Sequence, residues 1–318
     1  MRFAFFGTAP FAAIILERLL DAGLIPQFVV TQPDAISRRG NARWPSAVAD
    51  VATQASLPLG KPDKLRDPAL QTPLIAALHD LDCVVLAAYG RIISPVLLDA
   101  PRKGWINVHA SLLPRWRGAA PLQRAILAGD ELTGVSIMRM EAGLDTGPYC
   151  AQTQAPVGDK NCDQLEEALA AAGAQLLLAE LPQIVNDTAT WHEQDQSQVT
   201  YAQKIEKHEL DLSPAQAPLT NVRRVRASSN SAPARLTLFG KGKEIPLRAL
   251  SAELRPLKSL RRHGAGTVLC DSGDHLALIS TAHNEYCAIT SLQPAGKRPQ
   301  SSADFLRGLR SGERLRWR

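Results

Sequence analysis

Residues 83–89, Cys-Val-Val-Leu-Ala-Ala-Tyr, form the most apolar stretch of the chain and end at Gly90. A short apolar run without alternation is typical of a strand that is buried on both faces of a parallel sheet. Arg2–Gly7 and Gly104–Ala110 are similar runs, and residues 67–80 have helical spacing. Because strands and helices alternate along this half of the chain, we predict an α/β fold with a doubly wound, mostly parallel sheet.

The length of 318 residues predicts two domains, at roughly 100–200 residues for each. From residue 234 onward, short strand candidates separated by glycine-containing turns replace the strand–helix alternation. About five short strands in such a segment favour a small β-barrel of the oligonucleotide-binding kind. We therefore predict an α/β domain over residues 1–188, a linker over 189–208 and a basic barrel domain over 209–318.

The basic residues are concentrated in the C-terminal third. Residues 221–318 contain 18 Lys and Arg against 7 Asp and Glu, a net charge of +11, whereas residues 1–190 have a net charge of −3. Nucleic acid is the leading candidate partner, because bound cations displace the counterions condensed on a polyanion. A basic surface that only aids solubility is the alternative interpretation.

The overall composition excludes several classes of protein. Apolar residues make up 45% and charged residues 21% of the chain, which argues against disorder. The five cysteines are widely spaced and contain no Cys-x-x-Cys pair, so neither a disulfide framework nor a structural zinc site is expected. We find no signal-peptide pattern and no apolar run long enough for a membrane span, and we predict a cytoplasmic, soluble protein.

Asn107 and His109 lie two positions apart where a predicted strand ends, so their side chains should share one face. Ligands of open α/β sheets bind outside the carboxyl ends of the strands. A carboxamide and an imidazole that point into this crevice can polarise a carbonyl group and stabilise the oxyanion of a tetrahedral intermediate. A hydrogen-bonded strand end without catalytic function is the alternative interpretation.

Asp145 lies in the segment Gly143-Leu144-Asp145-Thr146-Gly147, after another predicted strand. The glycines allow a tight turn, and adjacent strands should bring the carboxylate near His109, where it could orient the imidazole or assist proton transfer. An Asx turn is the alternative. The sequence contains no Gly-x-Ser-x-Gly, P-loop or His-Glu-x-x-His motif, and these three side chains support acyl transfer without a covalent enzyme intermediate.

The segment Asn107–Pro121, NVHASLLPRWRGAAP, resembles the core signature of the folate-dependent formyltransferases. Gly134–Ile137 together with Gly143–Gly147 resembles the second signature of this family, and the likeness covers nearly the whole chain. The resemblance implies a Rossmann-like domain that takes the formyl group from 10-formyltetrahydrofolate. It also implies that the acceptor is the free α-amino group of methionine on initiator methionyl-tRNA, in translation initiation, and that the basic barrel binds this tRNA.

The resemblance also implies roles for individual residues. Asn107 and His109 would stabilise the oxyanion, and Asp145 would keep His109 in place and assist proton transfer. Residues implied in folate binding are Tyr89, Gly90, Ser111, Leu112, Leu113 and Pro114. Residues implied in tRNA binding are Arg39, Gly40, Lys204, Lys207, Arg223, Arg224 and Arg226. No metal is expected, and the protein is expected to be a monomer.

Two alternatives remain. A formyltransferase that acts on a sugar-nucleotide amine would use the same three side chains, but the basic C-terminal third favours tRNA. A non-catalytic RNA-binding protein could use the same domain as a scaffold, but a scaffold does not require Asn107, His109 and Asp145 together.

Overall fold

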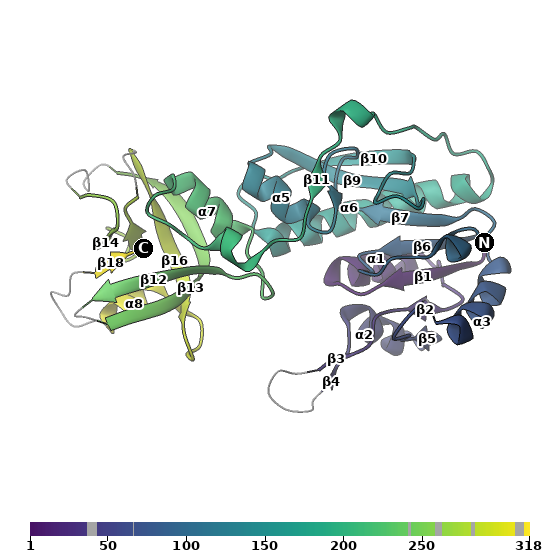
Figure 1. The fold of residues 1–318 in the computed structure, drawn as a ribbon, viewed down its shortest axis with the longest axis horizontal. Coiled ribbons are helices and arrows are strands. Elements are labelled where there is room, and N and C mark those ends of the chain that lie inside the picture. Colours follow the sequence, from purple (N-terminus) through teal and green to yellow (C-terminus); the bar gives the residue numbers. More distant parts are fainter. Residues whose placement is uncertain (37–42, 66, 241–242, 258–262, 281–283, 309–314) are drawn as a thin grey trace. The chain divides into compact units, whose positions relative to one another are not determined.

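The computed structural model describes residues 1–36, 43–65, 67–240, 243–257, 263–280, 284–308 and 315–318. These residues form two compact units (Figure 1). Unit 1 comprises Met1–Pro121, Glu131–Pro156 and Gln164–Gln203, and unit 2 comprises Leu122–Asp130, Val157–Asp163 and Lys204–Arg318. Leu122–Asp130 and Val157–Asp163, which lie within the predicted α/β domain, therefore belong to unit 2. The domain boundaries at residues 188 and 208 stay predictions.

Unit 1 is built on a seven-stranded sheet with the strand order β10-β9-β7-β6-β1-β2-β5. The strands are β1 (Phe3–Gly7), β2 (Val29–Val30), β5 (Leu59–Gly60), β6 (Cys83–Ala87), β7 (Trp105–His109), β9 (Leu132–Arg139) and β10 (Tyr149–Pro156). Strands β7, β6, β1, β2 and β5 are parallel, whereas β9 and β10 run antiparallel to their neighbours. The predicted doubly wound, mostly parallel sheet is confirmed.

The helices of this half of the chain are α1 (Pro10–Asp21), α2 (Ala47–Gln54), α3 (Pro68–His79), α4 (Pro95–Leu98), α5 (Pro121–Ala128) and α6 (Cys162–Val185). Helix α1 begins at a proline, whose missing N–H would have no partner in the first turn. Helix α2 is capped by Ser46 Oγ, which accepts a hydrogen bond from the Ala49 N–H at 3.0 Å. Short hairpin strands, β3 (Ala35–Ile36) and β4 (Arg43–Trp44), precede α2.

Helix α6 packs closely on the sheet at Gly173, where a Cβ atom would lie 2.9 Å from the Val108 side chain. Its side chains Leu169 and Leu177 are fully buried. Among the described residues, α6 is the one helix whose length and apolar composition would suffice to cross a membrane. A core helix of this kind meets the same criterion.

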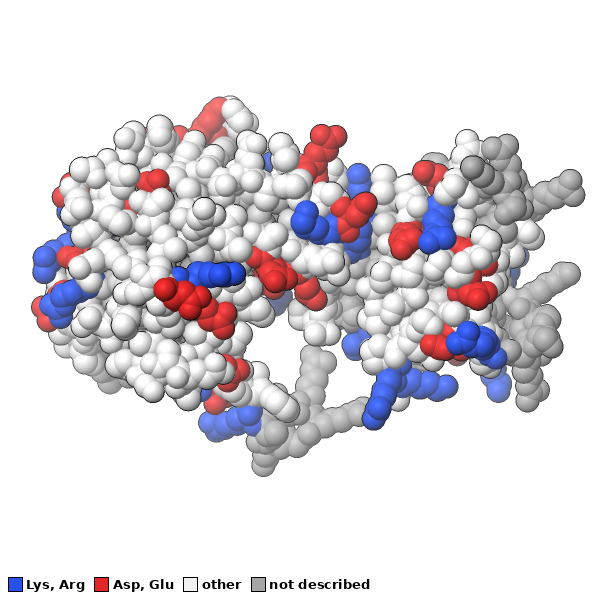
Figure 2. All heavy atoms as spheres, turned by 180° about the vertical axis from the view of Figure 1, so that it is seen from behind, with Lys and Arg blue, Asp and Glu red and all other residues white. Residues whose placement is uncertain are grey.

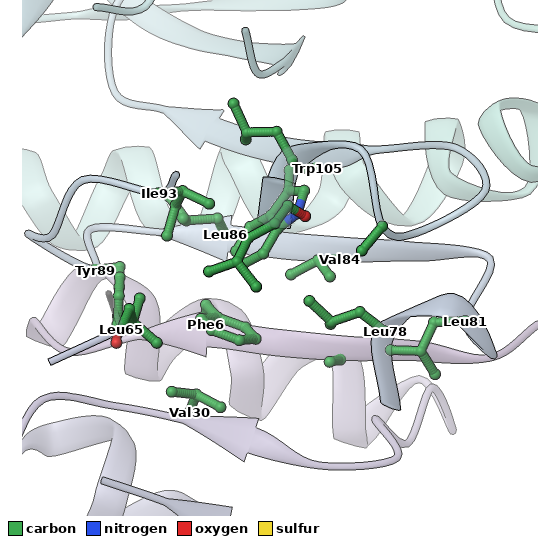
Figure 3. Packing of buried hydrophobic residues seen from close by; sticks show 14 residues of the cluster. Phe6, Val30, Leu65, Leu78, Leu81, Val84, Leu86, Tyr89, Ile93 and Trp105 are labelled. Carbon is green, nitrogen blue, oxygen red and sulfur yellow. The ribbon is translucent and has the colours of Figure 1, made fainter. Parts of the chain in front are cut away.

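A hydrophobic cluster of aliphatic side chains around three aromatic rings packs on one face of the sheet (Figure 3). The Phe6 ring on β1 lies edge-on to Trp105 at 4.7 Å and to Tyr89 at 5.5 Å between ring centroids. The indole N–H of Trp105 donates a hydrogen bond to the Leu97 carbonyl at 2.6 Å. Edge-to-face contacts add to the free energy of burial of each ring. The cluster thus stabilises β1, β6 and β7 together, and β7 carries Asn107 and His109.

Unit 2 contains a closed barrel of six antiparallel strands, which confirms the predicted barrel. Its strands are β12 (Ala234–Gly240), β13 (Lys243–Pro256), β14 (Thr267–Cys270), β15 (Leu276–Leu278), β16 (Glu285–Pro294) and β18 (Leu315–Trp317). The ring runs β13-β12-β18-β14-β15-β16 and closes through the pairing of β16 with β13. Closure leaves no free sheet edge in the ring. Strand β18 is absent from the sequence-based prediction, because three residues are too few to show a pattern.

Shorter elements complete the described chain. They are β8 (Arg117–Gly118) and β11 (Tyr201–Ala202) in unit 1, the 3₁₀ turns η1 (Gln196–Gln198) and η2 (Lys207–Leu210), and α7 (Pro218–Arg226), β17 (Gln300–Ser301) and α8 (Ser302–Arg307) in unit 2.

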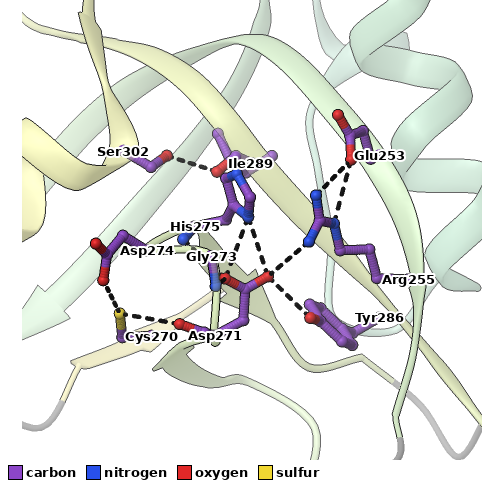
Figure 4. A network of polar contacts seen from close by, with 10 residues as sticks. All are labelled: Glu253, Arg255, Cys270, Asp271, Gly273, Asp274, His275, Tyr286, Ile289 and Ser302. Carbon is purple, nitrogen blue, oxygen red and sulfur yellow. Dashed lines mark hydrogen bonds and ion pairs between the residues drawn. The ribbon is translucent and has the colours of Figure 1, made fainter.

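A buried carboxylate, Asp271, organises the β14–β15 turn (Figure 4). It accepts hydrogen bonds at 2.9 Å from the backbone N–H groups of Gly273 and His275 and from the Tyr286 hydroxyl. The Arg255 guanidinium lies 3.8 Å away, and the Asp271 side chain is only 3% exposed. Burial alone would raise the pKa of Asp271, but these hydrogen bonds hold it below its ordinary value.

We expect Asp271→Asn to lower the free energy of unfolding by about 1–3 kcal/mol at pH 7, because a carboxylate that accepts charge-assisted hydrogen bonds is replaced by a neutral amide. The folded carboxyl binds a proton less readily than the unfolded one. Its contribution is therefore complete above the ordinary pKa of about 4 and is lost as the pH falls through the folded pKa. In urea unfolding, the difference between the variant and the unmodified protein should shrink below about pH 4.

Asp274→Asn is the matched control, because Asp274 lies in the same turn and is exposed. We expect it to change the free energy of unfolding by less than about 0.5 kcal/mol. Equal stability of the Asp271→Asn variant and the unmodified protein at pH 7 would contradict the assignment of Asp271 as the stabilising group.

Candidate active site

Asn107 and His109 lie at the carboxyl end of β7 and point to the same face of the strand. Each residue is 6% exposed. The Asn107 carboxamide makes no hydrogen bond to any residue that the structure describes. The alternative interpretation, a hydrogen-bonded strand end, therefore does not hold for Asn107. The carboxamide is not among the fully buried unpaired groups, so it keeps accessible surface and is available to a ligand.

The His109 imidazole has a different partner at each nitrogen. Its Nε2 lies 3.0 Å from the Trp116 carbonyl oxygen, and its Nδ1 lies 3.8 Å from Asp145 Oδ2. Because a carbonyl oxygen can only accept, the first contact requires a proton on Nε2. The second distance exceeds that of a direct hydrogen bond and is that of an ion pair when the imidazole is protonated.

Asp145 lies in the loop between β9 and β10 and has a φ of +51°, a left-handed conformation that Asp adopts more readily than most residues. Its Oδ2 accepts a hydrogen bond from the Gly118 N–H at 2.8 Å. Gly147 must be glycine, because a Cβ atom there would lie 2.0 Å from the Arg139 carbonyl oxygen. The predicted proximity of Asp145 and His109 is observed.

The predicted basis of this proximity, adjacent strands, agrees with the sheet, in which β9 and β7 are neighbours, but the prediction did not include their relative direction. Strand β9 runs antiparallel to β7, with Arg139 opposite Ile106 and Ser136 opposite His109. The end of β9 therefore lies beside the beginning of β7. Asp145 reaches His109 because the β9–β10 loop folds back along the strands.

A second segment, distant in sequence, holds the loop that follows β7. Strand β11 pairs in parallel with β8, and the Thr200 hydroxyl accepts a hydrogen bond from the Trp116 N–H at 2.9 Å. Gly118 has a φ of +122°, and a Cβ atom there would lie 2.9 Å from the Ala202 carbonyl oxygen. No pattern in the sequence of residues 200–202 predicts this role, because it depends on a contact between positions 84 residues apart.

Two family models match the chain: "Formyl transferase" over residues 1–181 and "Formyl transferase, C-terminal domain" over residues 204–310. The chain belongs to the formyl transferase family. A methionyl-tRNA formyltransferase from Halorhodospira halophila is 42% identical over 310 residues, which cover 97% of this chain and 96% of the relative. The one from Nitrosococcus oceani is 43% identical and covers 95% and 91%.

Solved structures of formyl transferases and related proteins share the fold. One is an N-formyltransferase from Helicobacter canadensis in complex with folinic acid and dTDP-3-aminofucose, with a TM-score of 0.61 at 15% identity over 92% of this chain and 98% of that one. Another is HypX from Aquifex aeolicus in complex with tetrahydrofolic acid, with a TM-score of 0.63 at 17% identity over 96% of this chain and 47% of that one. At these identities the likeness is one of fold.

The turn Ser111–Pro114, predicted from the formyl transferase resemblance to bind folate, follows His109 directly and ends in a cis Leu113–Pro114 bond. Ser136 Oγ donates to the Ser111 carbonyl at 2.7 Å and accepts from the Leu113 N–H at 3.0 Å. The Ser111 hydroxyl donates to the Arg115 carbonyl. This turn is therefore held from β9, and only its remaining groups, such as the half-buried side chains of Leu112 and Pro114, are left for a ligand.

Tyr89 and Gly90 differ in what they offer to a ligand. The Tyr89 ring belongs to the hydrophobic cluster of Figure 3, and burial raises the pKa of its hydroxyl to about 12. Its carbonyl oxygen accepts a hydrogen bond from Gln32 Nε2 at 2.6 Å. Gly90 is exposed with a φ of +74°. Any contact of this segment with folate would therefore involve backbone and not the Tyr89 ring, and the role of both residues stays a prediction.

The predicted tRNA-binding residues are in different situations. Lys204 and Lys207 are exposed. Arg224 donates to the Asp211 carbonyl at 2.6 Å, and Arg226 donates to the Lys160 and Gly158 carbonyls. Burial lowers the pKa of both guanidinium groups.

Arg223, by contrast, is half-buried, and its side chain makes no hydrogen bond or ion pair with the described part of the chain. Arg39 and Gly40 lie outside the described residues. The two arginines with internal partners are thus less available to a phosphate than Lys204, Lys207 and Arg223.

Much of the basic excess also lies outside the described residues. Of the 18 basic residues in 221–318, six are not described: Lys241, Lys258, Arg261, Arg262, Arg310 and Arg314. On the face that Figure 2 shows, Lys and Arg are interspersed with Asp and Glu. Across the described ranges, no group of three His, Cys, Asp or Glu side chains could hold a metal ion.

Proposed function

We propose that this protein transfers the formyl group of 10-formyltetrahydrofolate to the free α-amino group of methionine on initiator methionyl-tRNA. The observation that carries the proposal is the unpaired Asn107 carboxamide, on a residue that is 6% exposed, beside the His109–Asp145 pair at the carboxyl end of β7. The named relatives that are 42–43% identical are methionyl-tRNA formyltransferases. The solved relatives that were crystallised with folinic or tetrahydrofolic acid support a folate as the donor.

The unpaired carboxamide fits a ligand with a carbonyl oxygen, and bound formylfolate would supply an electrophilic formyl carbon. When the amine of the acceptor attacks that carbon, negative charge develops on the formyl oxygen. The Asn107 N–H group can donate to this oxygen and stabilise the charge, because the site is largely shielded from water.

His109 and Asp145 serve orientation and proton transfer. The Trp116 carbonyl fixes one edge of the imidazole, while the Asp145 carboxylate faces the other. Oδ2 of Asp145 is held by the Gly118 N–H, which leaves Oδ1 able to accept the proton that the attacking amine must lose. The attack forms the new C–N bond, and the bond between the formyl carbon and the folate nitrogen then breaks as that nitrogen takes up a proton, which balances the proton lost by the attacking amine.

Incubation with 10-formyltetrahydrofolate and charged initiator tRNA tests the proposal. We expect N-formylmethionine to be recovered after the aminoacyl bond is hydrolysed, and to be separated from methionine by chromatography. Parallel reactions use charged elongator tRNA and a dTDP-aminosugar as acceptors. A formylated sugar without formylated methionine would overturn the assignment of the acceptor. We also propose that the protein acts in the cytoplasm and as a monomer.

A further inference from the structure

Gln194, in the segment between α6 and β11, uses its whole side chain to hold the Asp145 loop. Its Nε2 donates hydrogen bonds to the Asp145 carbonyl at 2.8 Å and to the Gly147 carbonyl at 2.7 Å. Its Oε1 accepts a hydrogen bond from Arg117 Nε at 2.9 Å. Gln194 is 4% exposed, so these bonds are shielded from competing water.

Arg117 connects this contact to the other anchor of Asp145. Its side chain is directed at Gln194, and its neighbour Gly118 donates the backbone N–H that binds Asp145 Oδ2. Arg117 is 2% exposed, and its Nη2 has no hydrogen-bond partner in the described structure. The arginine is thus buried at the cost of one unpaired NH2 group, which carries two N–H donors. A purely structural tie would not require this cost, because an apolar side chain would fill the space.

The Asp145 loop needs such support. Asp145 is in the left-handed region, and the glycines at 143 and 147 have more intrinsic backbone freedom than other residues, so the folded conformation must be held by contacts. The Gly118 contact fixes the carboxylate, and the Gln194 contacts fix the peptide groups that follow Asp145 and Gly147. Without both donors of Gln194, two carbonyl oxygens lose their partners and the loop can adopt other conformations.

We propose that Gln194, supported by Arg117, is a positioning residue that keeps the Asp145 carboxylate 3.8 Å from His109. The catalytic part of this inference rests on the proposed function, whereas the positioning itself does not. Gln194 touches no reacting atom and acts through Asp145. Its effect should therefore appear in the rate of the chemical step and not in substrate binding.

Gln194→Glu is the most direct test. The glutamate has nearly the same shape and keeps an acceptor for Arg117, but it removes both donors to the loop. We expect kcat to fall about 10-fold, with KM for folate and for tRNA within about 2-fold of the unmodified protein. Gln194→Ala should have the same effect. It replaces the glutamate variant in the test if thermal unfolding shows that the glutamate variant is not folded. Gln198→Ala, an exposed glutamine of the same segment, is the control and should leave kcat unchanged.

A double-mutant cycle separates positioning from a general loss of structure. In an Asp145→Asn background, Gln194→Glu should lower kcat by less than about 2-fold further, because the carboxylate that it positions is already gone. If the fold-reductions in kcat of the two single variants multiplied in the double variant, the proposal would be overturned.

Hydrogen exchange at the Gly118 amide gives a readout that needs no substrate. This amide is bound to Asp145 Oδ2, and we expect its exchange to become at least about 5-fold faster in Gln194→Glu but not in Gln198→Ala. Unchanged exchange at Gly118 would overturn the positioning role. If the unmodified protein failed to formylate methionyl-tRNA, the proposed function would fall while the exchange result would still decide the role of Gln194.

Discussion

Replacing Asn107 with alanine should lower kcat about 100-fold or more, because loss of one donor to a developing oxyanion typically costs this much. Asn107 is 6% exposed, and its side chain has no hydrogen-bond partner among the described residues. Its removal therefore leaves no other described group without a hydrogen bond. The donated hydrogen bond strengthens as charge develops, and KM for the folate should therefore change far less than kcat. Steady-state kinetics with both substrates varied provides the measurement.

Two further variants sharpen this prediction. Asn107→Asp keeps the shape but places a carboxylate beside the developing oxyanion, so its kcat should fall below that of the alanine variant. Asn186→Ala, at an exposed asparagine after α6, is the control and should turn over normally. Normal kcat for both Asn107→Ala and His109→Ala, with folate and tRNA saturating, would rule out the mechanism.

The main features of the fold could be predicted because they follow from local patterns. Strands β1, β6 and β7 are continuous apolar runs, and every residue of each is buried. The face shared by Asn107 and His109 follows from strand geometry alone. Neither result depends on how distant segments pack.

The rest of the site depends on contacts between distant segments. The direction of β9 decides which way the Asp145 loop must fold, and a strand's residues do not reveal whether its partner is parallel or antiparallel. Gln194 and Asp145 are 49 positions apart, and the segment around Gln194 is polar without periodicity. Tyr89 precedes an exposed glycine, yet its ring packs into the core. Only the folded chain shows these relations.

The basic helix α7 is a similar case. Arg223, Arg224 and Arg226 look equivalent in the sequence, and all three are predicted to bind tRNA. In the folded protein, Arg224 and Arg226 are partly desolvated and donate to backbone carbonyls of unit 2. A charge count therefore predicts the kind of partner better than it predicts the individual contacts.

The affinity for tRNA should fall steeply with salt, by about 1,000-fold between 50 and 200 mM if roughly six phosphates are neutralised. The net charge of +11 in residues 221–318 is the reason for expecting that many contacts. Each neutralised phosphate releases condensed counterions, and the gain in their entropy shrinks as the bulk salt concentration rises. Fluorescence anisotropy of labelled tRNA gives the slope of log K against log salt.

The slope of log K against log salt can also show which individual basic residues contact phosphates. Removing the exposed side chains of Lys204 and Lys207 together, as Lys204→Gln/Lys207→Gln, should reduce the magnitude of the slope by about 2, because each phosphate contact contributes nearly one unit. Lys64→Gln removes an exposed lysine of unit 1 that has no predicted contact and should leave the slope unchanged. A flat plot for the unmodified protein would show that the basic C-terminal third does not neutralise phosphates. An unchanged slope for the double variant alone would instead place the contacts on other cations, and Arg223→Gln would then be the next variant to measure.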